Sequence, residues 1–457
     1  MLILYPLGYT DIKEQGIMNR NKISSFQIIL GGFLAVILIG TGLLMLPAAS
    51  RSGQAAFFTE ALFTSASAVC VTGLVVRDTA TFWSPFGKVV ILGLIQVGGL
   101  GVVTMATLIT LFSGKRVSLR QKNLLMESIS ARQMGGIIRY MRLILLITFG
   151  TELLGAFFLL PVFAGEYGIM KGARMSVFHA VSAFCNAGFD LMGEKAVFSS
   201  LTGYAGNVPV NLVIMILITV GGIGFQTLED LGRHRLRFSR LSLQSRLILI
   251  TSGILVFVPA VIFWFLEYPQ LPGKERLLAS LFQSVTTRTA GFNTMDYGNM
   301  SEPGQLLVIL LMLAGGSPGS TAGGIKTTTV ALLAVSAFSV FRRKNTDTVL
   351  GRRISEKTVR DAAAILGVYS LAFLAVSGLI CRLEGLPLLT CMFECASAIG
   401  TVGLSLGVTP HLGTVSRMFL VFLMVFGRVG GLTLVCAALP SAGIEYAKYP
   451  EEPVSVG

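Results

Sequence analysis

The stretch SAIGTVGLS, residues 397–405, holds the tripeptide Thr401-Val402-Gly403 directly after an apolar run that is too short to cross a bilayer. Three similar stretches precede it, SAVCVTGLV (67–75), SAFCNAGFD (182–190) and TTRTAGFNT (286–294). Their glycines recur roughly every 100 to 115 residues, at Gly73, Gly188, Gly291 and Gly403. This period predicts four copies of one unit, whose four loops could meet around one axis.

The composition is that of an integral membrane protein. Of 457 residues, 53% are hydrophobic and 13% are charged, and the mean hydropathy is +0.75. The net charge of +13 comes from Lys and Arg clustered between long apolar runs, as in membrane anchors, and does not indicate nucleic-acid binding. The six cysteines form no CxxC pair, which disfavours a zinc site or disulfide framework. No HExxH, GxSxG or P-loop motif is present, so we do not expect an enzyme.

Each unit is predicted to contain a spanning helix, a re-entrant half-helix, a loop and a second spanning helix. The fold class is therefore an all-α membrane protein of four pseudo-repeats around a central pore, resembling potassium-channel pore units. The predicted first spans are 26–46, 137–163 (ending at Pro161), 247–266 and 359–380, and the half-helices are 57–69, 174–184, 276–285 and 388–398. The predicted second spans are 88–112, 208–228, 305–341 and 416–439, the first of them interrupted by Gly98, Gly99 and Gly101.

The corresponding division of the chain has six parts. A cytoplasmic N-terminal tail (1–22) is followed by pore repeats 1 (23–125), 2 (126–240), 3 (241–350, with a broken inner helix) and 4 (351–440), and by a C-terminal tail (441–457). The native start could be Met1 or Met18.

A second regularity supports the four copies. Each loop glycine is preceded by a phenylalanine and, four residues after it, by a small hydroxyl residue: Phe63 and Ser67, Phe178 and Ser182, Phe282 and Thr286, Phe393 and Ser397. Such repeated agreement argues against a chance origin of the repeat.

Charge predicts the orientation. Most of the 36 Lys and Arg residues lie in the N-terminal tail and in the segments joining the units, so these should face the cytoplasm, with both termini inside and all four loops open to the outside. Asp78, Asp190 and Asp296 follow the loops and would attract cations to the outer mouth, although each could equally be a solvated loop carboxylate.

The loops have the chemistry of a cation filter. Four half-helices entering from outside would direct the negative ends of their dipoles at one point, and small residues leave backbone carbonyls free to replace the hydration shell of an ion. Glycine permits positive φ and close approach of four backbones. The predicted ion-binding residues are Val71, Thr72, Gly73, Asn186, Ala187, Gly188, Thr289, Ala290, Gly291, Thr401, Val402 and Gly403.

The second span of repeat 3 should be broken. Its middle is rich in glycine and holds Pro318, so it cannot form a regular helix and could fold as a plug under the filter, the alternative being a merely kinked helix. Two basic residues, Lys326 and Arg428, would lie within the membrane and are functional candidates for that reason. The predicted gate comprises Gly315, Gly316, Ser317, Gly319, Ser320, Thr321, Gly323, Gly324, Lys326 and Arg428.

Other polar residues in apolar segments are assigned supporting roles. We expect Glu152 to be a packing acid paired with a basic or backbone group, in preference to a proton carrier. His179 and Glu394 should be hydrogen-bonded behind the filter. Cys70 and Cys185 precede their tripeptides and should belong to the wall that supports the filter.

These features together resemble the Trk/Ktr/HKT superfamily of cation-translocating subunits, and within it the KtrB type. The resemblance covers nearly the whole chain and includes LIQVGGLG (94–101), SAFCNAGF (182–189), TRTAGFN (287–293), GSPGSTAGGIKTTT (316–329) and FGRVGGLT (426–433). Eight spans are similar to KtrB, because the TrkH type has an additional N-terminal hairpin.

The resemblance implies potassium uptake across the cytoplasmic membrane, with K⁺ as the transported ion and no covalent cofactor. It implies a homodimer on a cytosolic KtrA-type nucleotide-binding ring, a gating role for the glycine-rich loop, and a pore-facing role for Arg428. Four glycines, including Gly73, favour potassium over sodium in this superfamily. The alternatives left open are a secondary cation transporter coupled to Na⁺ or H⁺, and an ammonium- or sodium-permeable member of the superfamily.

Overall fold

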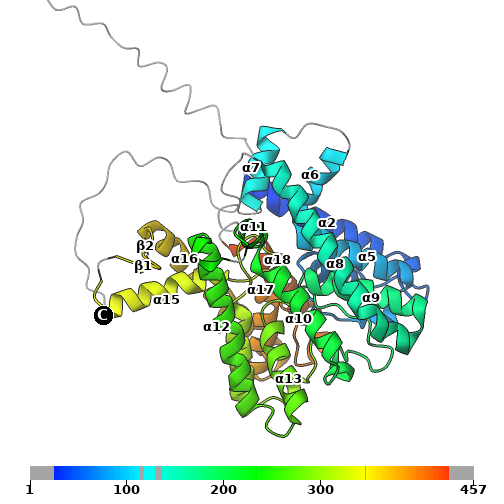
Figure 1. Cartoon of the computed structure of the whole chain (residues 1–457). Helices are drawn as coiled ribbons and strands as arrows, with labels where there is room; N and C mark the ends of the chain where they lie inside the picture. Colours follow the sequence, from blue (N-terminus) through cyan, green and yellow to red (C-terminus); the bar gives the residue numbers. More distant parts are fainter. Residues whose placement is uncertain (1–24, 113–117, 129–135, 236, 345, 432–457) are drawn as a thin grey trace, which may run out of the picture.

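The computed structural model describes residues 25–112, 118–128, 136–235, 237–344 and 346–431, and in this part of the chain the architecture is a bundle of helices with one short hairpin (Figure 1). The predicted tails 1–22 and 441–457, the alternative start Met18, and the end of the last predicted span lie outside the described residues. Short helices α6 and α7 lie at one end of the bundle, opposite the end that carries α13 (Figure 1).

The helices follow the predicted order of outer helix, half-helix and inner helix. The first unit has α2 (Ser25–Leu44), α3 (Phe58–Val69), α4 (Thr79–Phe82), α5 (Pro85–Leu100) and α6 (Val102–Phe112), and α7 (Leu119–Ser128) follows it. The second has α8 (Ile137–Tyr167), α9 (Ile169–Phe184), α10 (Val208–Ile223) and α11 (Phe225–Arg233). The third has α12 (Leu243–Leu266), α13 (Gly273–Thr286), α14 (Glu302–Leu313) and α15 (Thr327–Phe341), and the fourth has α16 (Glu356–Glu384), α17 (Leu388–Gly400) and α18 (Thr414–Val429).

Short elements connect these helices. Strands β1 (Thr348–Val349) and β2 (Arg352–Arg353) pair antiparallel between the third and fourth units. The 3₁₀ turns are η1 (Pro47–Ala49), η2 (Thr202–Tyr204), η3 (Phe238–Arg240), η4 (Tyr297–Asn299) and η5 (Thr409–His411).

The outer helices are the long, straight elements. Among the described residues, α2, α8, α12 and α16 are each long and apolar enough to cross a membrane. The prediction that Pro161 ends the second of these helices is wrong, because α8 continues to Tyr167. A proline inside a membrane-spanning helix is tolerated where neighbouring helices and local adjustments satisfy the backbone group that it frees.

Three inner helices begin with the same local signal. Ser84, Asn207 and Ser301 each cap their helix by accepting a hydrogen bond from a backbone N–H three residues later, at 3.2, 3.1 and 3.2 Å. A proline follows each cap within two residues, where its fixed φ suits a first helical turn. The polar cap and proline therefore fix where the chain turns back from the loop into the bundle.

The inner helices do not run straight through the bundle. The bend between α5 and α6 is 96° and the bend between α10 and α11 is 95°. The segment predicted as a span at 88–112 is therefore broken at the interruption expected near Gly101, and the segment predicted at 208–228 is broken as well. Each bend lies at a glycine with positive φ, Gly101 (88°) and Gly224 (96°), and α18 ends at a similar residue, Gly430 (95°). L-residues rarely adopt this conformation, so these glycines end the helices. The break predicted in the third unit is confirmed, since α14 and α15 are separated by residues 314–326.

The four units close into a ring through their half-helices. Each half-helix packs against the outer helix of its own unit, as α3 does against α2 and α9 against α8. Each also packs against the inner helix of the preceding unit: α9 on α5, α13 on α10, α17 on α14, and α3 on α18. Because the last of these contacts joins the fourth unit to the first, the four loops that follow the half-helices surround one axis.

Candidate ion pathway

The four loop glycines form a closed ring of backbone contacts. A Cβ atom added to Gly73 would lie 2.4 Å from the carbonyl oxygen of Ala187, and one added to Gly188 would lie 2.7 Å from that of Ala290. The ring continues from Gly291 to Val402 O (2.3 Å) and closes from Gly403 to Thr72 O (2.2 Å). Every glycine thus faces the middle carbonyl of the next tripeptide, and no side chain fits at any of the four positions without moving backbone.

The backbone of the four tripeptides is alike although their side chains differ. The first residue of each has positive φ: Val71 (56°), Asn186 (58°), Thr289 (69°) and Thr401 (50°). Positive φ is uncommon for residues other than glycine, and for a β-branched residue such as Val71 it is a true outlier. Strain of this kind persists only where the surrounding structure enforces it, so the loop conformation is imposed by the ring.

The predicted hydroxyl residues hold the loops in two ways. Ser67 and Ser397 accept hydrogen bonds from the N–H groups of Gly73 (3.0 Å) and Gly403 (2.9 Å). Ser182 and Thr286 instead donate to the carbonyl oxygens of the residues after the glycines, as follows: Ser182 to Phe189 (2.7 Å) and Thr286 to Phe292 (2.5 Å). All four side chains are buried, and the phenylalanines four residues before them are also buried. The shared spacing in the sequence therefore marks the wall behind the ring.

Two polar side chains behind the ring occupy their predicted places. The His179 ring contacts the carbonyl oxygen of Met175 through Nδ1 and the N–H of Leu191 through Nε2. Glu394 accepts hydrogen bonds from the Ser405 hydroxyl, the Thr409 hydroxyl and the Leu406 N–H. The prediction that both are satisfied by hydrogen bonds is confirmed.

A cavity of about 320 Å³ lies at one mouth of the ring and is bordered by all four loop glycines. Asp78, Asp190 and Asp296 also line it. Asp78 accepts hydrogen bonds from the Thr81 N–H and hydroxyl and from the Phe198 N–H, so it also fastens the first loop to the second. Desolvation raises the pKa of Asp190, which lies in a loop outside the spanning helices, to about 7, and the neighbouring Asp78 adds to this rise. The mouth is therefore acidic, with one carboxyl group that titrates near neutral pH.

The segment between α14 and α15 lies against the other side of the ring. A Cβ on Gly323 would lie 2.2 Å from the hydroxyl oxygen of Thr401, the first residue of the fourth tripeptide. The Ser317 N–H donates to Gly222 O at 3.0 Å, and Thr321 donates through its N–H and hydroxyl to Gly221 O, at 3.2 and 3.1 Å. The predicted gate residues therefore lie together beneath the loops, on the side away from the acidic cavity.

Arg428 and Lys326 both bind this segment. The guanidinium of Arg428 donates to the carbonyl oxygens of Thr321, Gly98 and Gly99, the last at 3.2 Å. The Lys326 ammonium donates to the carbonyl oxygen of Ala322 at 2.7 Å. Arg428 of the fourth unit thereby joins the broken segment of the third unit to the inner helix of the first.

Three features of the pathway were missed in the sequence. The prediction of a basic or backbone partner for Glu152 is wrong: this buried acid accepts a hydrogen bond from the Gln96 amide at 3.1 Å and one from the Cys185 thiol at 3.8 Å. The acceptor role of Gly98 and Gly99 and the bend at Gly224 were also not foreseen, whereas an interruption of the helix was expected at Gly101. The recurrence of two glycines three residues apart, at 98 and 101, 221 and 224, and 427 and 430, was the available signal.

Four outer helices that are long and apolar enough to cross a membrane, four half-helices and a closed ring of loops are the architecture of a multi-pass membrane protein. The chain belongs to the TrkH family of cation transport proteins, whose family model matches residues 9–446. This is a family of transporters and not of enzymes.

Individual relatives are similar over almost their whole length. The chain is 38% identical over 452 residues to the potassium/sodium uptake protein NtpJ of Enterococcus hirae, covering 96% of this chain and 98% of that one. It is 40% identical to Ktr system potassium uptake protein B of Bacillus subtilis, covering 90% of this chain and 92% of the relative. The crystal structure of the potassium transporter TrkH from Vibrio parahaemolyticus shares the fold, with a TM-score of 0.72 at 19% identity over 93% of this chain and 86% of that chain.

Proposed function

We propose that this protein takes up potassium through a pore whose filter is the ring of four loops. The observation that carries the proposal is the closed cycle of contacts between each loop glycine and the middle carbonyl of the next tripeptide. Four carbonyl-lined loops at the ends of four half-helices can replace the hydration shell of a cation. The names of the relatives from Enterococcus hirae and Bacillus subtilis support potassium as the ion.

The ligands in this proposal are chiefly backbone oxygens of the twelve tripeptide residues. The side chains differ between units, whereas the glycine conformation and the carbonyl contacts recur in all four. The hydroxyls of Thr72 and Thr401 are buried and have no hydrogen-bond partner among the described residues. An unpaired buried hydroxyl is costly, and a dehydrated cation would satisfy it, so these two oxygens are additional ligands in the proposal.

The segment from residue 314 to 326 is the proposed gate. It lies against Thr401 and is held by hydrogen bonds to glycine carbonyls and by Arg428. Small side chains and glycines allow such a segment to move without repacking large groups. Opening would require Arg428 to release its acceptors, and its positive charge would oppose ion passage while it stays in place.

We further propose the arrangement in the membrane and the assembly. The acidic cavity faces outward, both termini face the cytoplasm, and the four repeats keep the boundaries predicted from the sequence; the distribution of Lys and Arg supports this. The name "Ktr system" of a close relative supports a regulatory partner. The partner in this proposal is a cytosolic KtrA-type ring that binds the nucleotide, beneath a homodimer of this chain in the cytoplasmic membrane.

The second candidate function is potassium and sodium uptake by one protein. It is favoured by the similarity to the potassium/sodium uptake protein of Enterococcus hirae. The two sequences are 38% identical over 96% of this chain. A coupled secondary transporter has less support, because the four units share one orientation and form one ring.

Uptake of K⁺ and Na⁺ by cells lacking other potassium systems tests the proposal and its alternative. Gly73→Ser and Gly403→Ser place a side chain where the nearest backbone oxygen is 2.4 and 2.2 Å from Cβ. We expect both variants to lose their preference for K⁺ over Na⁺, while the parent protein carries K⁺ without added Na⁺. Unchanged ion preference in both variants would refute the filter, and K⁺ uptake that requires Na⁺ would favour coupling.

A further inference from the structure

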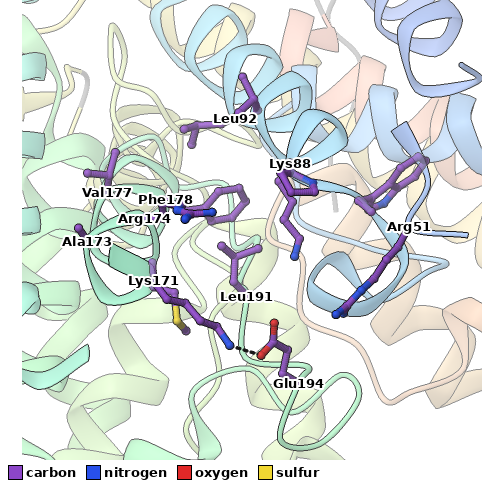
Figure 2. Close-up of a pocket in the computed structure, with 14 residues that line it drawn as sticks. Arg51, Lys88, Leu92, Lys171, Ala173, Arg174, Val177, Phe178, Leu191 and Glu194 are labelled. Carbon is purple, nitrogen blue, oxygen red and sulfur yellow. Dashed lines mark hydrogen bonds and ion pairs between the residues drawn. The ribbon is translucent and has the colours of Figure 1, made fainter. Parts of the chain in front are cut away.

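A second cavity, of about 630 Å³, lies away from the pore between the first and second units (Figure 2). One wall comes from the start of α5, with Lys88 and Leu92, and the opposite wall comes from α9, with Arg174 and Phe178. The loop after the second tripeptide contributes Leu191 and Glu194. Because that loop also lines the acidic mouth, this cavity lies at the same end of the bundle.

The cavity has an excess of positive charge. Four basic residues line it, Arg51, Lys88, Lys171 and Arg174, against one acid, Glu194. Glu194 accepts a hydrogen bond from Lys171 (Figure 2). This bond, followed by the charges of Lys171, Lys88 and Arg51, keeps the pKa of Glu194 below its usual range. One acid therefore lies among four basic residues and is paired with only one of them.

Among the described residues, three of the four basic groups bind no acid, and the side chains of two of them have no partner at all. Lys88 donates to the carbonyl oxygen of Ala80 at 2.7 Å, but no hydrogen bond or ion pair is formed by the guanidinium of Arg51 or Arg174 within the described residues. Figure 2 shows Arg51 and Lys88 extending from one side toward the space that holds Glu194 and Lys171. Unpaired guanidinium groups at a cavity are suited to a phosphate, which they bind through paired N–H donors.

The rest of the wall is apolar and continues onto the outer surface of the bundle. Val89 and Val177, which line the cavity from α5 and α9, are 67% and 44% exposed. In a bundle that crosses a membrane, exposed apolar side chains on these helices contact lipid. The cavity thus joins a basic polar end to an apolar face within one space.

We propose that this cavity binds an anionic phospholipid, with its phosphate between Arg51, Lys88 and Arg174 and its acyl chains along Val89, Leu92 and Val177. A basic pocket between membrane helices is suited to an anionic headgroup. Free inorganic phosphate would not use the apolar wall. The volume accommodates a headgroup and glycerol backbone, so the chains must lie outside, along α5 and α9. The lipid would join the first two units beside the ring.

Fluorescence provides a local test, because the chain has two tryptophans and one of them, Trp83, lines the cavity. The full-length protein carrying Trp264→Phe is reconstituted in phosphatidylcholine vesicles, and phosphatidylglycerol or phosphatidylcholine with brominated acyl chains is titrated in. Bromine quenches nearby indole fluorescence. We expect brominated phosphatidylglycerol to quench Trp83 at about tenfold lower mole fraction than brominated phosphatidylcholine, the preference expected for a basic site at a membrane surface.

Paired variants show whether the cavity is responsible. Arg51→Gln with Arg174→Gln should lower the preference for phosphatidylglycerol by about tenfold, whereas Arg382→Gln, at an exposed arginine near the end of α16 that does not line the cavity, should leave it unchanged. Equal quenching by the two lipids in the parent protein would overturn the proposal. An unchanged preference in the double variant would do so as well.

The same preparation distinguishes the other occupants. Displacement of phosphatidylglycerol by millimolar inorganic phosphate would show an anion site and not a lipid site, which contradicts the proposal. Native mass spectrometry of the double variant should show bound phosphatidylglycerol lost and the subunit stoichiometry unchanged. Dissociation of subunits with no loss of lipid would show that the cavity holds a second copy of this chain.

Discussion

The ring of loops keeps the fourfold repeat of the chain, whereas the layer beneath it does not. In the ring, four units contribute equally, through glycines that each contact the middle carbonyl of the next tripeptide. In the layer beneath, the third unit alone supplies the segment 314–326, and the fourth alone supplies the arginine that binds it. Ion coordination needs equivalent ligands on all sides, whereas control needs one movable part. Under the proposed function, the repeat is preserved where an ion would be bound and lost where its passage would be regulated.

The largest effect is expected from a side chain placed in the ring. Gly403→Ala brings Cβ to 2.2 Å from Thr72 O at a φ of 98°, so the fourth loop must move and carbonyl geometry is lost. We expect ⁸⁶Rb⁺ uptake into proteoliposomes to fall by at least about 100-fold.

A matched glycine separates crowding from backbone strain. Gly407 has a similar φ of 85° but nothing within 4 Å of an added Cβ. Gly407→Ala should retain most of the uptake. Equal loss in both variants would mean that strain, and not the ring, causes the defect.

Releasing the segment 314–326 should raise ion flux, whereas a side chain in the ring lowers it. Arg428→Gln removes the charge and the paired donors that join Thr321 to Gly98 and Gly99. We expect ion flux in proteoliposomes to rise by about fivefold, because the segment is no longer fastened across the pore. Arg428→Lys keeps the charge but not the planar donors; a rise in this variant as well would assign the effect to fastening. Unchanged or lower flux in Arg428→Gln would contradict a closing role.

Removing a single hydroxyl group that supports the ring should have a smaller effect. Ser397→Ala leaves the Gly403 N–H without its acceptor at 2.9 Å, which should cost about 1 kcal/mol and loosen one loop. We expect a lower K⁺ preference over Na⁺ in competition uptake. Thr107→Val removes a buried hydroxyl that donates within α6 to Val103 O at 2.8 Å, away from the loops, and should not alter ion preference. A change of similar size in both variants would show a general loss of packing.

The smallest effect is a pH dependence at the acidic mouth. Desolvation raises the pKa of Asp190 to about 7, so this carboxyl group is neutral at pH 6 and ionised at pH 8. Its charge concentrates cations, and we expect the half-saturating K⁺ concentration to fall by about threefold as pH rises over this interval. The effect on stability has the opposite sign, because a raised carboxyl pKa stabilises the fold at low pH and that contribution is lost above about 7. Asp190→Asn should flatten the profile of half-saturation against pH, and a parent profile without a step near 7 would contradict the assignment.

The repeat and its chemistry were available from the sequence. Short apolar runs before Gly73, Gly188, Gly291 and Gly403 predicted half-helices, because segments of that length can neither span a bilayer nor remain in lipid unpaired. The proline and glycines of residues 314–326 likewise predicted a broken helix. These conclusions rest on local properties, such as length, hydropathy and backbone freedom, that each segment carries wherever it is placed.

Only the tertiary structure decided how the loops meet and what holds them. Ser67 and Ser182 fasten their loops in two different ways, although each bonds a residue only six or seven positions further on. The order of the units around the axis and the glycine-to-carbonyl contacts join residues more than a hundred positions apart. Glu152 contacts Gln96 and Cys185, and Arg428 reaches Gly98, for the same reason. Local propensity specifies where a helix bends at Gly101, but which carbonyl then faces a distant side chain depends on the packing of all four units.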